Sequence, residues 1–240
     1  MKLIVSDLDG TLLLKKEKEL HRLSISAIEK ILNSNMAFCV ASGRNYSELK
    51  RILKNFESRA YLIANDGALA VHKDKTIFDF PIDRAKLKLF EEEKNFVAHG
   101  KYHSFVRSDS ERFIRGIKEQ YSGHIVRIDT IDEINEPIYK ITLYDKKTDF
   151  PGLDRVYCDN YMCEYVEKGT NKGMAVSELM KVLKIRESDA VAIGDGQNDA
   201  EMFELIGKSY IMAGATPRIK KMGKYVVNNF NDAVDKIFEG

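Results

Sequence analysis

The feature that most constrains the fold is the start of the chain, which reads MKLIVSDLDG. A short apolar run at residues 3–5 leads directly to two aspartates, Asp7 and Asp9. A run of this length that ends in polar residues is typical of a buried strand. Carboxylates at the end of such a strand are costly unless a cation or a reaction uses them. The sequence therefore predicts an inner strand that delivers charged side chains to its carboxyl end.

Strands and helices alternate in the two flanking parts of the chain. The apolar pattern predicts strands at residues 3–6, 36–40, 61–64, 190–193, 210–212 and 225–227. It predicts helices at residues 46–56, 172–183, 200–206, 217–222 and 232–238. Ser26 and Glu29 form a capping-box pair that opens one further helix, through residue 32. This alternation favours an α/β fold with a Rossmann-like, doubly wound parallel sheet.

The middle of the chain, residues 82–167, has a different pattern. Helices at 84–93 and 110–121 are interleaved with strands near residues 96, 105, 125–128, 139–144, 155–158 and 163–166. Strands grouped between helices favour an antiparallel sheet with helices on one face. We therefore expect an α/β core of residues 1–81 plus 168–240, interrupted by an inserted α+β domain at 82–167.

Composition argues against several classes of function. The net charge of +1 shows no basic excess for nucleic-acid binding. No apolar stretch approaches the ~20 residues of a membrane span.

We expect a cytoplasmic protein whose three cysteines are unpaired, with a hairpin disulfide between Cys158 and Cys163 as the alternative. His99 and His103 are expected in a polar loop rather than in a metal site, because the segment offers no third ligand. The sequence does not fix the oligomeric state.

Carboxylates from two strands are predicted to meet. In an open parallel sheet the ligand crevice lies beyond the carboxyl ends of the strands, where the strand order reverses. If the first strand is central, Asp7 and Asp195 end neighbouring strands about 4.8 Å apart, and Asp9 and Asp199 follow close behind. Oxygen ligands of this kind suit Mg²⁺, which also takes substrate phosphate. Zinc is disfavoured, because no His or Cys lies in either segment.

Anion-binding groups are predicted beside these carboxylates. Ser42, Gly43 and Arg44 follow the second strand and precede a helix, so they offer a hydroxyl and amides at a helix N-terminus. Lys172 begins the helix after the insert and can hold a phosphoryl oxygen. Taken singly, Lys172 is an ordinary surface lysine and the segment at Asp195 an ordinary turn. Taken together in this order, the parts describe phosphoryl transfer with a carboxylate nucleophile.

Four segments resemble the motifs of the haloacid dehalogenase-like (HAD) superfamily. They are DLDGT at residues 7–11, ASGR at 41–44, NKG at 171–173 and GDGQND at 194–199, and they occur in the family order. The insert is similar to the cap domain of the Cof-type phosphatase subgroup. Members of that subgroup mostly hydrolyse sugar phosphates and other small phosphorylated metabolites. The resemblance implies a Mg²⁺-dependent phosphatase that works through an aspartyl-phosphate.

The resemblance also implies a role for each matching residue. Asp7 would be the nucleophile, and Asp9 would protonate the leaving alcohol and then activate water. Asp7, Asp195 and the backbone carbonyl of Asp9 would bind Mg²⁺. The remaining roles fall to the phosphate and substrate binders Ser42, Gly43, Arg44, Lys172 and Asn198, and to Asp199, which would fix Lys172 or a metal-bound water.

One residue departs from the family pattern. Asp66 stands where members often have asparagine, so it adds negative charge near the crevice.

Three cap residues are candidates to meet the leaving group, namely Arg107, Lys140 and Tyr165. Two other functions remain open at this point: a phosphomutase on the same scaffold, which shares the nucleophile and metal, and a non-catalytic phospholigand-binding protein.

Overall fold

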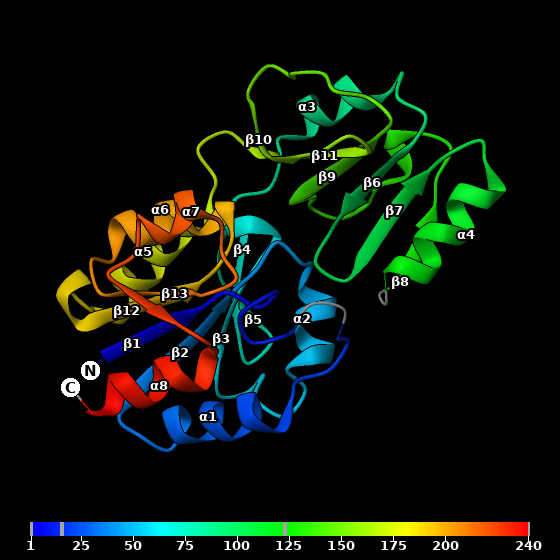
Figure 1. Ribbon diagram of the computed structural model, residues 1–240. Helices are drawn as coiled ribbons and strands as arrows, with labels where there is room; N and C mark the ends of the chain where they lie inside the picture. Colours follow the sequence, from blue (N-terminus) through cyan, green and yellow to red (C-terminus); the bar gives the residue numbers. More distant parts are fainter. Residues whose placement is uncertain (1, 15–16, 122–123, 240) are drawn as a thin grey trace.

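Two β-sheets organise the chain, each within its own lobe (Figure 1). The computed structural model describes residues 2–14, 17–121 and 124–239. The first lobe, here called the core, holds an eight-stranded sheet in the order β14-β13-β12-β1-β2-β3-β4-β5. Its strands are β1 (Lys2–Ser6), β2 (Met36–Ala41), β3 (Tyr61–Ala64), β4 (Leu69–His72), β5 (Lys75–Asp79), β12 (Ala190–Gly194), β13 (Ser209–Met212) and β14 (Tyr225–Val227).

The strands from β14 to β3 run parallel, and helices cover both faces of this part of the sheet (Figure 1). On β1 the side chain of Ile4 packs with the helices on one face, whereas Leu3 and Val5 pack with those on the other. The first face carries α1 (Arg22–Leu32), α2 (Tyr46–Ile52) and α8 (Phe230–Glu239). The second carries α5 (Lys172–Leu183), α6 (Ala200–Leu205) and α7 (Pro217–Lys220). The predicted doubly wound α/β fold is therefore confirmed.

The second lobe, here called the cap, holds a six-stranded sheet in the order β10-β11-β9-β6-β7-β8. Its strands are β6 (Phe96–His99), β7 (His103–Arg107), β8 (His124–Arg127), β9 (Lys140–Tyr144), β10 (Leu153–Cys158) and β11 (Met162–Glu167). Its helices are α3 (Arg84–Leu87) and α4 (Glu111–Gln120). The pairing is antiparallel except between β7 and β8, which run parallel because α4 crosses over between them.

The cap helices lie on opposite faces of the sheet, so the expectation of helices on one face is wrong. Phe96 of β6 packs with Leu87 of α3, whereas its neighbour Val97 packs with Ile114 and Ile117 of α4. Successive residues of a strand point to opposite faces. Helices therefore cover part of each face of the cap sheet.

Several local expectations needed correction. The strands β4 and β5 form an antiparallel hairpin at the sheet edge that was not anticipated. Helix α1 begins at Arg22, not at Ser26, because the His21 side chain caps it by accepting from Leu23 N–H. The predicted helices at 46–56 and 84–93 end early, at Ile52 and Leu87, and continue as turns or short 3₁₀ segments. The 3₁₀ helices are Asn65–Gly67, Lys88–Phe90, Ile131–Glu133, Glu187–Asp189 and Gln197–Asp199.

Two cysteines and two histidines lie differently from their predicted places. Cys158 and Cys163 face each other across β10 and β11 and form a disulfide, with Cα atoms 4.0 Å apart, so the expectation of unpaired cysteines holds only for the buried Cys39. His99 and His103 lie on adjoining strands, not in a loop. Among the residues that the structure describes, no helix has the length and apolar character needed to cross a membrane.

Candidate active site

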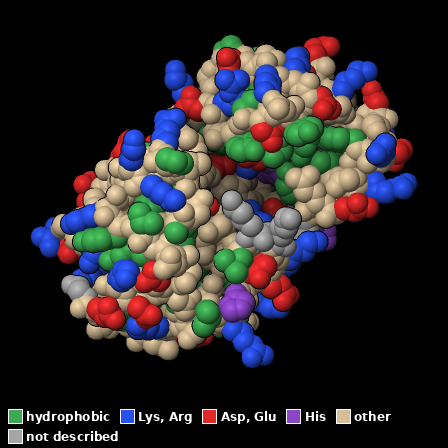
Figure 2. Space-filling model, in the orientation of Figure 1, with side chains coloured by type: hydrophobic (Ala, Val, Ile, Leu, Met, Phe, Trp, Pro, Cys, Tyr) green, Lys and Arg blue, Asp and Glu red, His purple; other side chains and the backbone are tan. Residues whose placement is uncertain are grey.

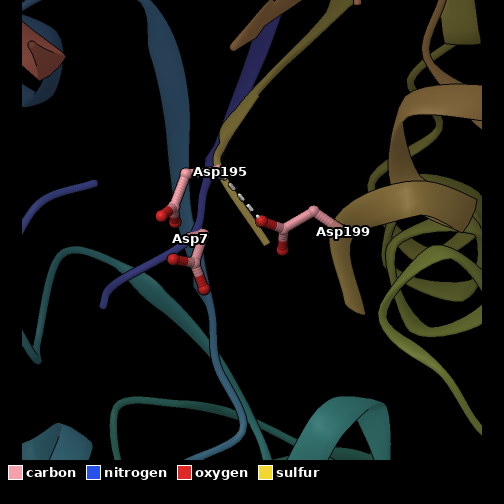
Figure 3. Close-up of side chains that lie close together, drawn as sticks. All are labelled: Asp7, Asp195 and Asp199. Carbon is pink, nitrogen blue, oxygen red and sulfur yellow. Dashed lines mark hydrogen bonds between the residues drawn. The ribbon is translucent and has the colours of Figure 1, made fainter. Parts of the chain in front are cut away.

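Three aspartates meet where β1 and β12 end. Asp7 follows β1 and donates its backbone N–H to Ile193 O on β12 at 2.8 Å. Because the two strands are parallel and in register, Asp195 arrives at the same edge of the sheet. Asp199 joins them from the following turn, and the three carboxylates offer oxygens within 4.8 Å of one another (Figure 3). Asp7 and Asp199 are buried and Asp195 is half-buried, so this is a largely buried cluster of like charge.

Lys172 neutralises part of this cluster. It is the first residue of α5, which begins where the Asn171 side chain accepts from Met174 N–H. Its Nζ lies 2.6 Å from Asp7 Oδ1 and 2.7 Å from Asp199 Oδ1, with no exposed side-chain surface. Burial alone would lower the pKa of Lys172, but the carboxylates of Asp199 and Asp7 raise it above its ordinary value. Lys172 is therefore a fixed cation at the bottom of the site.

The protonation of Asp7 is governed by opposing effects. Burial raises the pKa of Asp7 well above its usual value, and Lys172 opposes that rise. The neighbouring carboxylates of Asp199 and Asp195 raise the pKa further. A divalent cation beside Asp7 would favour its ionised form. The site thus has an electrostatic need for positive charge beyond that of Lys172.

Asp199 accepts hydrogen bonds that hold other parts of the site in place. Its Oδ1 accepts from Lys172, and its Oδ2 accepts from the backbone N–H groups of Asp195 and Gly196 at 3.1 and 2.9 Å. Both oxygens are thus engaged with protein donors. Asp199 shapes the turn that presents Asp195 and holds Lys172 against Asp7.

Asp9 lies apart from the buried cluster, at its solvent side. Arg44 holds its carboxylate through two hydrogen bonds, from Nε at 2.8 Å and from Nη2 at 2.7 Å. The bond to Asp9 raises the pKa of Arg44 above its usual value. Nη1 of Arg44 also lies 3.5 Å from Oε1 of Glu48. The Glu48 carboxyl is buried, and this burial raises its pKa. The Asp9 carboxylate is thus outside the group of three carboxylates suited to a metal, which contains Asp199 instead.

Close backbone packing holds the loops together. Gly10 has φ of +88°, and a Cβ at this position would lie 2.4 Å from Asp195 Oδ2. A side chain there would be strained and would displace the carboxylate. In the second loop, Ser42 Oγ accepts from Arg44 N–H at 3.2 Å, and a Cβ on Gly43 would lie 2.9 Å from Asp66 Oδ2.

A cavity of about 800 Å³ lies over this edge of the sheet, between core and cap. Figure 2 shows it as a hollow between the lobes, with hydrophobic side chains on the cap wall. The sequence-predicted residues that line it are Asp7, Asp9, Ser42, Gly43, Arg44, Asp66, Asp195 and Asn198. Lys172 and Asp199 are not among its lining residues; both contact Asp7 or its neighbours from within the core.

The cap wall was less predictable. Of the three candidates from the sequence, only Lys140 lines the cavity. Arg107 donates to Glu91 O, and the ring of Tyr165 packs in the cap interior. Sequence reasoning missed several lining residues of the cap, namely Tyr121, Tyr157, Met162 and Glu164. The alternation along β11 carried a signal, since Met162 and Glu164 share one face of that strand and Tyr165 the other.

The donor set fits a hard divalent cation. The three clustered groups all offer carboxylate oxygens, which Mg²⁺ prefers. Among the described residues, this is the single group of three or more His, Cys, Asp or Glu side chains that lie close enough to share an ion. His99 and His103 do not form such a site: His99 is buried between Ser104 and Thr142, and His103 pairs with Glu136.

Comparison with known proteins agrees with this geometry. Residues 4–238 match a family model described as haloacid dehalogenase-like hydrolase. The chain is 22% identical to the 5-amino-6-(5-phospho-D-ribitylamino)uracil phosphatase YbjI of Escherichia coli K12, covering 100% of this chain and 97% of that one. It is 26% identical to the HMP-PP phosphatase of Escherichia coli O6:H1, covering 91% and 86%. A haloacid dehalogenase-like hydrolase from Bacteroides thetaiotaomicron has the same fold, with a TM-score of 0.86, 19% identity and 99% coverage of both chains.

Proposed function

The chain belongs to the haloacid dehalogenase-like hydrolase family and is a phosphatase of its Cof-type subgroup, and on this premise we propose that it hydrolyses a small phosphorylated metabolite through phosphorylated Asp7, with Mg²⁺ as cofactor. The observation that carries the proposal is the placement of Asp7. Its carboxylate lines the cavity, contacts the buried ammonium of Lys172 and lies within reach of Asp195. A nucleophile, a fixed cation and a cation site thus converge on one point.

The proposed reaction has two steps. A carboxylate oxygen of Asp7 attacks the phosphorus, the bond to the leaving oxygen breaks, and the leaving alcohol takes a proton from Asp9. Water then attacks the phosphorus of the aspartyl-phosphate and gives a proton to Asp9, which frees inorganic phosphate and restores Asp7. Lys172 and Ser42 hold the transferring phosphoryl oxygens. Arg44 holds both oxygens of the Asp9 carboxylate in the resting site, and one of these two hydrogen bonds opens when Asp9 carries the proton.

Mg²⁺ would be held by Asp7, Asp195 and the backbone carbonyl of Asp9, where it supplies positive charge for the oxygens of the transferring group. In this proposal Asp199 is not a ligand, because both of its oxygens already accept hydrogen bonds from Lys172 and the 195–196 backbone. Asn198 is placed to contact substrate from the same loop, since it lines the cavity.

We also propose that residues 1–81 plus 168–240 form the catalytic core and 82–167 the cap. Every strand of the eight-stranded sheet lies outside 82–167, and every strand of the six-stranded sheet lies inside it. The cap supplies one wall of the cavity and so would select the leaving group. The cavity volume is in the range of small-molecule sites, ~300–1,000 Å³. The two curated relatives act on phosphorylated small molecules, which supports a sugar phosphate or similar phosphomonoester as substrate.

A screen of metabolite phosphates tests this function. Phosphate release is followed with Mg²⁺ present, with the Asp7→Asn variant purified in parallel. We expect release of one phosphate per turnover for at least one small phosphomonoester, and none from the variant. Turnover that isomerises the substrate without releasing phosphate would instead indicate a phosphomutase. Binding without turnover across the whole panel would indicate a non-catalytic phospholigand-binding protein.

A further inference from the structure

One cap lysine is buried against the loop that carries the predicted phosphate binders. Lys140 is the first residue of β9, in the interior of the cap sheet, and its side chain is 5% exposed. Its Nζ donates to Gly43 O at 2.5 Å and lies 3.3 Å from Asp66 Oδ2 and 3.0 Å from Glu164 Oε1. An ammonium has three N–H donors, so each of them has an acceptor. Lys140 is therefore committed to protein groups and is not free to bind a leaving group.

Asp66, the partner of Lys140, connects three parts of the core. Its backbone N–H donates to Ser42 O at 3.1 Å, and its Oδ1 accepts from Asn198 Nδ2 at 2.9 Å. It is 3% exposed and adopts a left-handed backbone conformation, with φ of 55°. Burial would raise the pKa of Asp66, but Lys140 and Lys172 lower it below its ordinary value. The carboxylate is therefore ionised and depends on these cations.

We propose that Lys140 and Asp66 are a pair of positioning residues that fixes the 42–44 loop from the cap side. The pair joins the cap to the loop at two points, through Gly43 O and through Asp66, whose N–H holds Ser42 O. An amide at position 66 would accept a hydrogen bond but would form no ion pair. The aspartate at position 66 and the lysine at position 140 therefore complement each other in charge.

The pair matters for the reaction because Ser42 and Arg44 lie on this loop. Arg44 N–H is bonded to Ser42 Oγ, and its guanidinium holds Asp9. A shift of the loop would therefore move a phosphate binder and the acid/base residue together. A misplacement of about 1 Å at a catalytic group can cost ~10²-fold in rate.

Four variants test the pair by kinetics: Lys140→Met, Asp66→Asn, their double variant, and the control Lys146→Met. Lys140→Met leaves the carboxylates of Asp66 and Glu164 without their shared cation, which is costly, whereas the double variant removes the charge of Asp66. We expect Lys140→Met to lower kcat by at least ~10-fold with a smaller change in KM. The double variant should recover part of that loss, because Asp66 no longer needs a cation although Gly43 O and Glu164 still lack the ammonium. Lys146 is a half-exposed cap lysine paired with Glu93, and its replacement should leave kcat unchanged.

Amide hydrogen exchange tests the same pair without an assay of activity. The reporters are the N–H groups of Arg44, Asn65 and Asp66, which bond to Ser42 Oγ, Arg44 O and Ser42 O. We expect these amides to exchange faster in Lys140→Met than in the wild type. Their exchange rates in the double variant should lie between those of the wild type and of Lys140→Met. If Lys140→Met does not fold, Asp66→Asn carries the test, with faster exchange expected at Arg44 and Asn65.

The kinetic arm rests on the proposed phosphatase activity, whereas the exchange arm does not. If the wild type releases no phosphate from any substrate, the proposed function fails and the exchange data alone decide on the pair. Unchanged exchange at all three amides in the folded variants would overturn the inference. Losses of kcat that simply multiply in the double variant would also overturn it, because independent roles need no rescue.

Discussion

Lys172 Nζ and Asp7 Oδ1 lie 2.6 Å apart, although 165 positions separate them in the chain. Asp7 directly follows the first strand, and Lys172 begins the first helix after the cap. The contact is buried and continues to Asp199, which accepts from the same ammonium. The two halves of the core must therefore come together around the cap insert before the site exists.

Loss of this buried cation should be strongly destabilising. Lys172→Met leaves the carboxylates of Asp7 and Asp199 buried without their shared partner, and removal of one member of a buried pair costs about 3–5 kcal/mol. We expect a fall of that size in the free energy of unfolding, measured by urea denaturation without divalent cations. The matched control is Lys181→Met on the exposed surface of the same helix, which should stay within about 0.5 kcal/mol of the wild type. A loss of equal size in both variants would contradict the account.

Binding of Mg²⁺ should stabilise the fold through the aspartate cluster. A ligand that binds only the native state raises stability by about 2.7 kcal/mol at 100 times its Kd. We therefore expect Mg²⁺ to raise Tm in a thermal-shift titration. Asp195→Asn should remove most of the rise, because it deletes one member of the cluster. Asp189→Asn, at a surface aspartate paired with Arg186, should respond to Mg²⁺ as the wild type does. An equal response of both variants would place the cation elsewhere.

The buried histidine of the cap should make stability depend on pH. His99 lies between Ser104 and Thr142, beside the ring of Tyr121. Its burial, and to a smaller extent the positive charge of Lys140, lower its pKa well below the ordinary 6.5. Between pH 6.5 and that lowered value the unfolded chain binds a proton that the native state does not. Stability should therefore fall as the pH decreases below about 6.5, with a slope of up to ~1.4 kcal/mol per pH unit from this group.

The His99→Gln variant isolates this contribution. Urea unfolding between pH 7.5 and about 5 should show a shallower loss of stability in this variant than in the wild type. His124→Gln replaces an exposed imidazole on β8 and should keep the wild-type slope. If His99→Gln also keeps the wild-type slope, His99 does not stay neutral in the native protein.

The two hydrogen bonds from Arg44 to Asp9 should matter for the chemical step. A lysine at position 44 keeps the charge but cannot reproduce the planar pair of donors. A hydrogen bond to a charged group contributes about 1.5–3 kcal/mol. Arg44→Lys should therefore lower kcat by roughly 10- to 100-fold. The control is Arg59→Lys, at an exposed arginine paired with Glu29, which should keep wild-type kcat. A wild-type kcat in Arg44→Lys would show that orientation of Asp9 does not depend on this pair.

The core was predictable because parallel strands obey simple rules. Each short apolar run became a strand, and the central place of β1 brought Asp7 and Asp195 to one edge of the sheet. Helix α5 begins at Lys172, as predicted, and the structure shows that the Asn171 side chain caps it. These features depend on local pattern and on the carboxyl-end rule, both of which are visible in a single sequence.

The cap and its cavity wall were harder to predict. Short amphipathic helices such as α3 and α4 show an apolar stripe, but nothing in that stripe says which face of a sheet it will cover. The hydrogen bonds of Lys140 to Gly43 and Asp66 depend on how the cap packs against the core, which no local sequence pattern encodes. The Cys158–Cys163 bond required the register of β10 against β11. In each case long-range packing decided the outcome.

The most direct test of the central claim is to look for the phosphoryl group on Asp7. The Asp9→Asn variant lacks both the acid of the first step and the group that activates water in the second. With p-nitrophenyl phosphate, whose phenolate leaves without a proton, it should still form the aspartyl-phosphate and then hydrolyse it slowly. After mixing with p-nitrophenyl phosphate and Mg²⁺, acid quenching and peptide mass spectrometry should find one added phosphoryl group on Asp7. The Asp7→Asn variant should show no added group and no phosphate release. Phosphate release by a clean preparation of Asp7→Asn, or a phosphoryl group on another residue, would contradict the account.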